Sequence, residues 1–256
     1  TNADVPGFTP LEKDIGPVIE NVIARSSEGM KVIESVRAID APFTVQVGGV
    51  AADYTDSMNG ITRMLPWLLL WVFASTLILL FLFTGSILLP IKAFLLNIIT
   101  LGATLGFLCW VFLDGNMMWL FGDFQLTGSI DASNFILIAV VAFGLSMDYE
   151  LFLLSRIKEL HDQGLSTEES VALGLQRSGR IITAAALILA VNFLPFVTSG
   201  VTSIKMLGLG LAFAILLDAT VVRALLVPAL MKLFGSANWW APKWMKWVFA
   251  KVGLDH

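Results

Sequence analysis

Residues Phe143–Glu159 read FGLSMDYELFLLSRIKE, and this stretch decides how the chain is organised. Its first half continues an apolar run that begins near Phe135, so Asp148 and Tyr149 lie within a segment that has the composition of a membrane span. Its second half, from Arg156 on, is charged. The stretch therefore predicts a transmembrane helix that carries a carboxylate inside the membrane.

The composition of the whole chain is also that of a membrane protein. Of its 256 residues, 57% are hydrophobic and 14% charged, whereas a soluble domain has about 25% charged residues. The mean hydropathy is +0.81, and the net charge of −4 says little about partners. The single cysteine, Cys109, can form no disulfide within the chain. Because the sequence begins at Thr1 in polar text without a signal peptide, we expect a piece of a longer protein or a processed one.

Five stretches are long and apolar enough to cross a bilayer, which takes about 20 helical residues. They lie at residues 65–83, 90–113, 134–155, 180–198 and 206–231. The first two are joined by TGSILLP, a connection short enough only for a hairpin. The sequence thus predicts an all-α polytopic bundle of five transmembrane helices in residues 64–231.

Lysine and arginine predict the orientation, because short basic loops stay in the cytoplasm. The 156–180 loop holds four basic residues and residues 232–256 hold four lysines, while the 114–133 loop holds three aspartates and no basic residue. The short loop with Lys205 is the exception. We therefore expect the C-terminus in the cytoplasm and residues 1–63 outside.

Residues 1–63 are expected to form the end of a short α+β domain. Apolar residues from Ile15 to Val36 recur at helical spacing. The following FTVQVGG, residues 43–49, alternates like a strand and ends in a Gly-Gly turn. One helix and one strand cannot form a core, so we expect the beginning of this domain to be missing.

Two further helices are predicted on the cytoplasmic side. Ser166 and Glu169 fit a capping box, so a helix is expected near 167–177, ending at Ser178-Gly179. In the tail, 232–256, tryptophans lie beside lysines (NWWAPKWMKWVFAK). We interpret this tail as an amphipathic helix at the membrane interface, with ordinary packing under the last span as the alternative.

Two carboxylates lie deep inside predicted spans. Asp148 precedes Arg156 by eight residues, about 12 Å of helix, and Asp218 follows Leu207 by eleven, about 16 Å. Small residues let helices approach closely in lipid, so both aspartates are expected to face another helix. The two stripes that contain them are Gly144, Asp148 and Ser155, and Gly210, Ala214 and Asp218.

An intramembrane carboxylate has two explanations. A group that can bind and release a proton there is what a proton relay needs, and Asp148, beside the hydroxyl of Tyr149, is the candidate. The alternative is a hydrogen bond between helices with no transport role. For Asp218 an ion pair with Arg223 is an equal alternative, although Arg223 could also extend to the membrane surface. The other polar candidates, for support or for bonding a neighbouring backbone, are Ser146, Asn97 and Asn192.

Several stretches match a known family. GLSMDYELFLLSRIKE resembles the tenth-helix signature of the MMPL ("mycobacterial membrane protein large") transporters, a branch of the resistance-nodulation-division (RND) superfamily. LLDATVVRALLVPALMKLFG, followed by NWWAPKW, is similar to that family's last helix and exit. VGGVAADYTDSM, FLFTGSILLPIKA and VFLDG also fall in the family's order, from about Val47 to Trp244. The exit is most similar to the branch that exports mycolic-acid glycolipids such as trehalose monomycolate.

The resemblance implies helices eight to twelve of a twelve-helix transporter in a bacterial plasma membrane, preceded by the end of its second periplasmic domain. In that family an Asp-Tyr pair on helix ten, matched by Asp148 and Tyr149, relays protons with a pair on helix four. The N-terminal half, helices one to seven, is therefore an expected partner. The implied activity is proton-driven export of a lipid or glycolipid for cell-envelope assembly, without a cofactor.

Other functions fit less well. Intramembrane aspartyl proteases carry GxGD, but Leu145 and Met147 occupy the glycine positions before Asp148. His161 and His256 lie outside the spans and belong to no HExxH motif. We expect neither an enzyme nor a nucleic-acid partner. The remaining alternative is a non-transporting scaffold or sensor module of the same superfamily, against which the Asp-Tyr pair argues.

Overall fold

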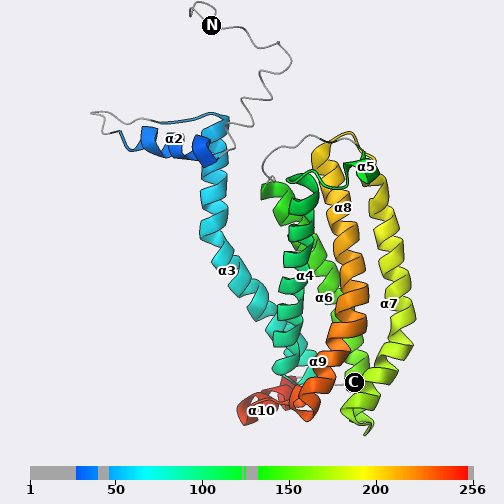
Figure 1. Ribbon diagram of the computed structural model, residues 1–256. Coiled ribbons are helices and arrows are strands. Elements are labelled where there is room, and N and C mark those ends of the chain that lie inside the picture. The colour runs from blue at the N-terminus through cyan, green and yellow to red at the C-terminus, as the bar shows by residue number, and fades with distance from the viewer. Residues whose placement is uncertain (1–26, 40–45, 123, 125–131, 253–256) are drawn as a thin grey trace, which may run out of the picture. The chain divides into compact units, whose positions relative to one another are not determined.

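The computed structural model describes residues 27–39, 46–122, 124 and 132–252, without the side chains of 27, 28, 132, 248, 250 and 252 (Figure 1). Every regular element in this part is helical. Five of its helices are long and apolar enough to cross a membrane, as hydropathy predicts. The described residues up to Leu68 belong to one compact unit, and those from Leu69 on belong to a second.

The helices follow one another with short connections. They are α2 (Ser27–Arg37), α3 (Val50–Thr84), α4 (Leu88–Phe112), α5 (Met118–Phe121), α6 (Ala132–Asp162), α7 (Thr167–Val197), α8 (Thr202–Leu217), the π-helix η1 (Asp218–Leu226), α9 (Val227–Phe234), the 3₁₀-helix η2 (Gly235–Trp239) and α10 (Lys243–Val252).

The α+β prediction for residues 1–63 is not supported. Residues 15–26 and 43–45 lie outside the described residues, and residues 46–48 form no strand. Instead Arg37, at the end of α2, pairs with Asp56 at 2.5 Å and donates a 3.4 Å hydrogen bond to the carbonyl of Val47. These bonds join the end of α2 to Val47 and to α3. Helix α3 begins fifteen residues before the predicted span, because its first turns are polar and hydropathy does not detect them.

The second unit is built around α8, which packs against α4, α6 and α7 (Figure 1). The absence of side chains at two glycines permits this packing. A Cβ on Gly210 would lie 2.9 Å from Leu108 and 3.0 Å from Ile138, and one on Gly208 would lie 2.5 Å from the Cβ of Phe196. The small-residue stripe that leads to Asp218 therefore faces other helices, as predicted.

The loop with Lys205 departs from the basic-loop rule for a structural reason. Lys205 is buried, and its ammonium donates a 2.7 Å hydrogen bond to the carbonyl of Phe121, at the end of the unpredicted helix α5. Lys205, in the first turn of α8, thus places its positive charge at the C-terminal end of α5, in the connection between α4 and α6.

The capping box at the start of α7 is confirmed. The Glu169 N–H donates to Ser166 Oγ at 3.2 Å, and the Ser166 N–H donates to Glu169 Oε2 at 3.1 Å. The predicted end at Ser178-Gly179 is wrong, because α7 continues to Val197 as one helix. A glycine inside a helix costs only about 1 kcal/mol, whereas a helix end in lipid would leave backbone groups unbonded.

The last span ends in a hydrogen-bonded junction with the α3–α4 hairpin. Asn238 Nδ2 donates to the carbonyls of Met231 and Gly235, both at 2.6 Å. Ser86 Oγ donates to the Asn238 carbonyl at 2.5 Å, and Lys92 donates to Asn238 Oδ1. Because Asn238 is fully buried, this junction fixes where the tail leaves the bundle.

Substitution of Gly208 tests the close approach of α7 and α8. We expect Gly208→Ala to destabilise the bundle by about 1–3 kcal/mol, since its Cβ would also lie 2.8 Å from the Phe193 carbonyl. Thermal unfolding of the detergent-purified protein measures this loss. Gly179→Ala, where a Cβ meets nothing within 4 Å, is the matched control and should leave the midpoint unchanged or raised. Equal midpoints for both variants would contradict the packing described here.

Candidate functional site

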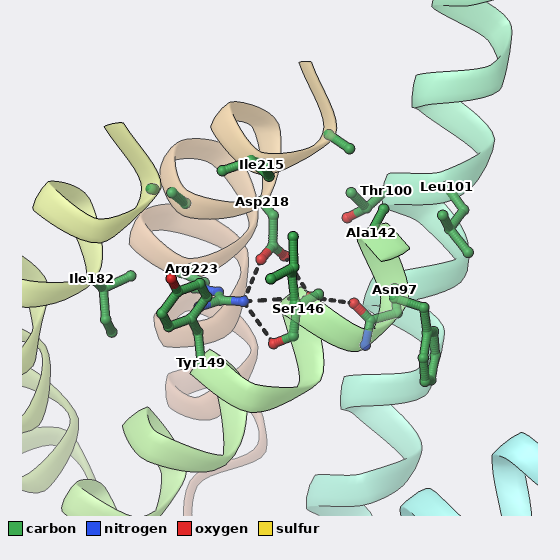
Figure 2. A pocket seen from close by; sticks show the side chains of 15 residues that line it. Asn97, Thr100, Leu101, Ala142, Ser146, Tyr149, Ile182, Ile215, Asp218 and Arg223 are labelled. Atoms are coloured by element: carbon green, nitrogen blue, oxygen red, sulfur yellow. Dashed lines mark hydrogen bonds and ion pairs between the residues drawn. The ribbon is translucent and has the colours of Figure 1, made fainter. Parts of the chain in front are cut away.

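Four polar side chains from three helical segments gather inside the bundle, as Figure 2 shows. Asn97 comes from α4, Ser146 from α6, and Asp218 and Arg223 from η1. All four are buried, with at most 6% of any residue exposed. Such a concentration of polar groups within candidate membrane spans marks this cluster as the candidate functional site.

The π-helix brings Asp218 and Arg223 together. In an α-helix, residues five apart point about 140° away from each other, whereas a π-helix joins residues five apart. At the end of η1 the Val227 N–H donates to the carbonyl of Val222, which is such a bond. Arg223 Nη2 thereby forms an ion pair with Asp218 Oδ2. The ion-pair interpretation of Arg223 is confirmed, and the side chain does not extend to the surface.

The hydroxyl of Ser146 joins the ion pair to α4. Ser146 Oγ lies 2.5 Å from Asn97 Oδ1 and 3.0 Å from Asp218 Oδ1, but it has only one proton to donate. The hydroxyl can therefore donate to the amide of Asn97 on α4 or to the carboxylate of Asp218 on η1, but not to both at once.

Arg223 is only partly satisfied. Its Nη2 also donates to the Ser146 carbonyl at 2.7 Å, but its Nε and Nη1 have no hydrogen-bond partner in the described part of the chain. The ring of Tyr149 lies 5.0 Å from Arg223 Cζ, within cation–π range. Arg223, Tyr149 and Asp218 line a small cavity (Figure 2).

Asp148 and Tyr149 do not face each other. Tyr149 is half-buried at the cluster, whereas Asp148 is exposed and has no hydrogen bond or ion pair with any described residue. Neighbouring residues on a helix point in different directions, so the expected hydrogen bond between them is absent. Gly144, one turn before Asp148, is likewise exposed, and a Cβ there would meet nothing within 4 Å. The stripe of Asp148 thus faces no other helix of the described chain.

Asn192 does not belong to the site. It is exposed on α7 and forms no hydrogen bond with a described residue. Of the candidates named from the sequence, the structure therefore gathers Ser146, Tyr149, Asp218 and Arg223, together with Asn97, and leaves out Asp148 and Asn192.

A second pair of buried charged residues, Glu150 and Lys92, was not predicted from the sequence. Glu150 is 6% exposed, and Lys92 is 8% exposed. They line a second small cavity, and Glu150 interacts electrostatically with Arg223, Asp218 and Lys92. The spacing of residues within Phe143–Glu159 favours this burial, because Glu150 follows Ser146 by one helical turn and so shares its inward face.

Among the described residues, no group of three or more histidine, cysteine, aspartate or glutamate side chains could hold a metal ion. The groups that meet at the site are a carboxylate, a hydroxyl, an amide and a guanidinium (Figure 2).

The chain is similar to several curated proteins. The trehalose monomycolate exporter MmpL3 of Mycobacterium tuberculosis is 44% identical over 241 residues, 93% of this chain. A putative membrane protein of Streptomyces coelicolor is 44% identical over 88% of the chain. MmpL11 of Mycolicibacterium smegmatis, named a mycolic acid-containing lipids exporter, is 37% identical over 83% of it.

These alignments cover 25%, 32% and 22% of the three relatives, so the chain spans a third of their length or less. The MMPL family profile matches residues 23–250, nearly the whole chain. This chain therefore belongs to the MMPL family.

Proposed function

We propose that the protein carrying this chain exports a lipid or glycolipid across the bacterial plasma membrane, driven by the proton gradient and without a cofactor. The cargo is of the mycolic-acid type, such as trehalose monomycolate, as the names of the relatives suggest. Residues 1–63 are periplasmic and the C-terminus is cytoplasmic. The observation that carries the proposal is the uncovered carboxylate of Asp148 within a candidate membrane span.

An uncovered carboxylate in lipid is costly, and such groups usually face other helices or water. The stripe around Asp148 continues with Leu137 and Val140, which are 46% and 57% exposed. Because the relatives are several times longer, the N-terminal half of the transporter can supply the helix that covers this stripe. Asp148 then becomes a group shared between the two halves, where it can take up and release a proton.

The buried cluster supports a path for that proton. Tyr149 follows Asp148 on α6, and its ring lies against the guanidinium of Arg223. The ion pair between Arg223 and Asp218 can form again when Asp218 loses its proton. Glu150, one turn after Ser146, continues the path toward Lys92 and the junction at Asn238. Protonation changes along this line would alter the contacts between α4, α6 and η1, and this change would drive the transport motion.

The alternative is a scaffold or sensor module that does not transport. Such a module would need the bundle to be folded, but it would have no need for a carboxylate on the uncovered face. The two functions differ in their dependence on Asp148.

We expect Asp148→Asn to abolish lipid export while leaving the membrane abundance of the protein normal, because the amide keeps the size of the side chain but cannot exchange a proton. Export is measured as labelled glycolipid reaching the outer envelope. Glu159→Gln is the matched control, since Glu159 lies on the same helix in an exposed ion pair with Arg156 at 2.6 Å. Full export by Asp148→Asn would remove the relay role and favour the scaffold.

Arg223→Met should destabilise the bundle by about 3–5 kcal/mol, because it leaves the carboxylate of Asp218 buried without its partner. The double variant Asp218→Asn/Arg223→Met should recover most of this loss in membrane abundance. If the pair also serves the relay, export remains absent in the double variant at restored abundance. Restored export would instead show that the pair has a structural role only.

Glu150→Gln tests the continuation of the path. A neutral amide fits the apolar surroundings of Glu150, so we expect normal abundance and reduced export. The reduction should be greatest when the imposed pH gradient is small, because proton transfer then limits the rate. An unchanged dependence of export on the gradient would exclude Glu150 from the path.

A further inference from the structure

The tail helix α10 has one packed face. Met245 is buried, and the ring of Phe249 lies 5.9 Å from that of Phe81, edge to face. Phe249 also lies 3.1 Å from the position that a Cβ on Gly85 would take. These contacts dock α10 on the end of α3 and on the α3–α4 turn.

The opposite face of α10 is uncovered. Trp244 and Trp247, three residues apart, are 68% and 61% exposed, and Trp240, just before the helix, is 60% exposed. Three indole side chains within eight residues form an apolar surface that is unfavourable in water. Indole groups prefer the headgroup region of a membrane, where the ring is desolvated and the N–H can still bond.

Positive charge surrounds these indoles. Lys243 and Lys246 are exposed, and neither has an ion-pair partner in the described part of the chain. Lys251 lies over the Trp247 ring at 4.0 Å. From residue 219 to the last described residue, 252, the sequence contains no aspartate or glutamate. The stretch that carries these lysines therefore has no acidic residue of its own to offset their charge.

We propose that this indole–lysine surface, formed by Trp240, Lys243, Trp244, Lys246 and Trp247, binds anionic phospholipid headgroups of the adjacent leaflet. A lysine near an anionic membrane favours binding roughly fivefold, and the indoles supply the apolar contact. The bound leaflet would hold the exit of the last span in register with the membrane. This inference does not depend on the cargo or on the proton path.

Tryptophan quenching by brominated lipids tests the surface. The protein that carries this chain is reconstituted in phosphatidylcholine vesicles containing a minor fraction of brominated phosphatidylglycerol or of brominated phosphatidylcholine. The part of the quenching that comes from the indole–lysine surface is the difference between the quenching of the unsubstituted protein and that of the double variant Trp244→Phe/Trp247→Phe. We expect brominated phosphatidylglycerol to quench this contribution severalfold more strongly than brominated phosphatidylcholine.

The charge variants decide the cause of that preference. Lys243→Gln/Lys246→Gln should abolish it, while Arg177→Gln/Arg180→Gln, which removes two exposed charges elsewhere, should retain it. Equal quenching by the two lipids, or a preference that survives the lysine changes, would overturn the proposal. Quenching by neither lipid would overturn it as well, since another part of the protein or a second copy would then cover the surface.

Discussion

A buried charge in a membrane protein must find its partners inside the protein, and this constraint underlies the arrangement of the bundle. The ion pair of Asp218 and Arg223 can form because the helix changes to π geometry at Asp218. The same change aims Arg223 at the carbonyl of Ser146 on α6. The close packing of α8 at Gly210 brings α4 and α6 near enough for Asn97 and Ser146 to complete the cluster.

Much of the bundle was predictable from the sequence, because lipid imposes a simple length and hydropathy rule. Five spans, the α3–α4 hairpin and the capping box at Ser166 follow from apolar run length and local hydrogen bonding. Helix ends were harder to predict, since α3 and α6 extend into polar sequence that hydropathy does not detect. The continuity of α7 through Gly179 was not predictable from local propensity, because glycine weakens a helix without ending one whose neighbouring turns are well formed.

The candidate site was predicted in part. Carboxylates inside apolar runs are visible in the sequence, so Asp218 was found, and its spacing to Arg223 suggested the pair. The π-helix that joins them has no sequence signal of its own. The burial of Glu150 was not predicted, although Glu150 follows Ser146 by four residues and so lies on the same helix face. The different directions of Asp148 and Tyr149 follow from helix geometry. The exposure of Asp148 on α6 could not be predicted, because apolar run length does not tell which face of a span other helices cover.

The unbroken helix α7 has a mechanical consequence. Its 31 residues make a rod about 46 Å long that joins the capped turn at Ser166 to Val197 at the other end. Near the capped end, Gly174 lies against Ile157 of α6, and the Thr167 hydroxyl accepts a 3.2 Å hydrogen bond from Trp239. Because α7 is continuous from Ser166 to Pro195, a small tilt of α7 against α8 would also displace the capped end that contacts Trp239.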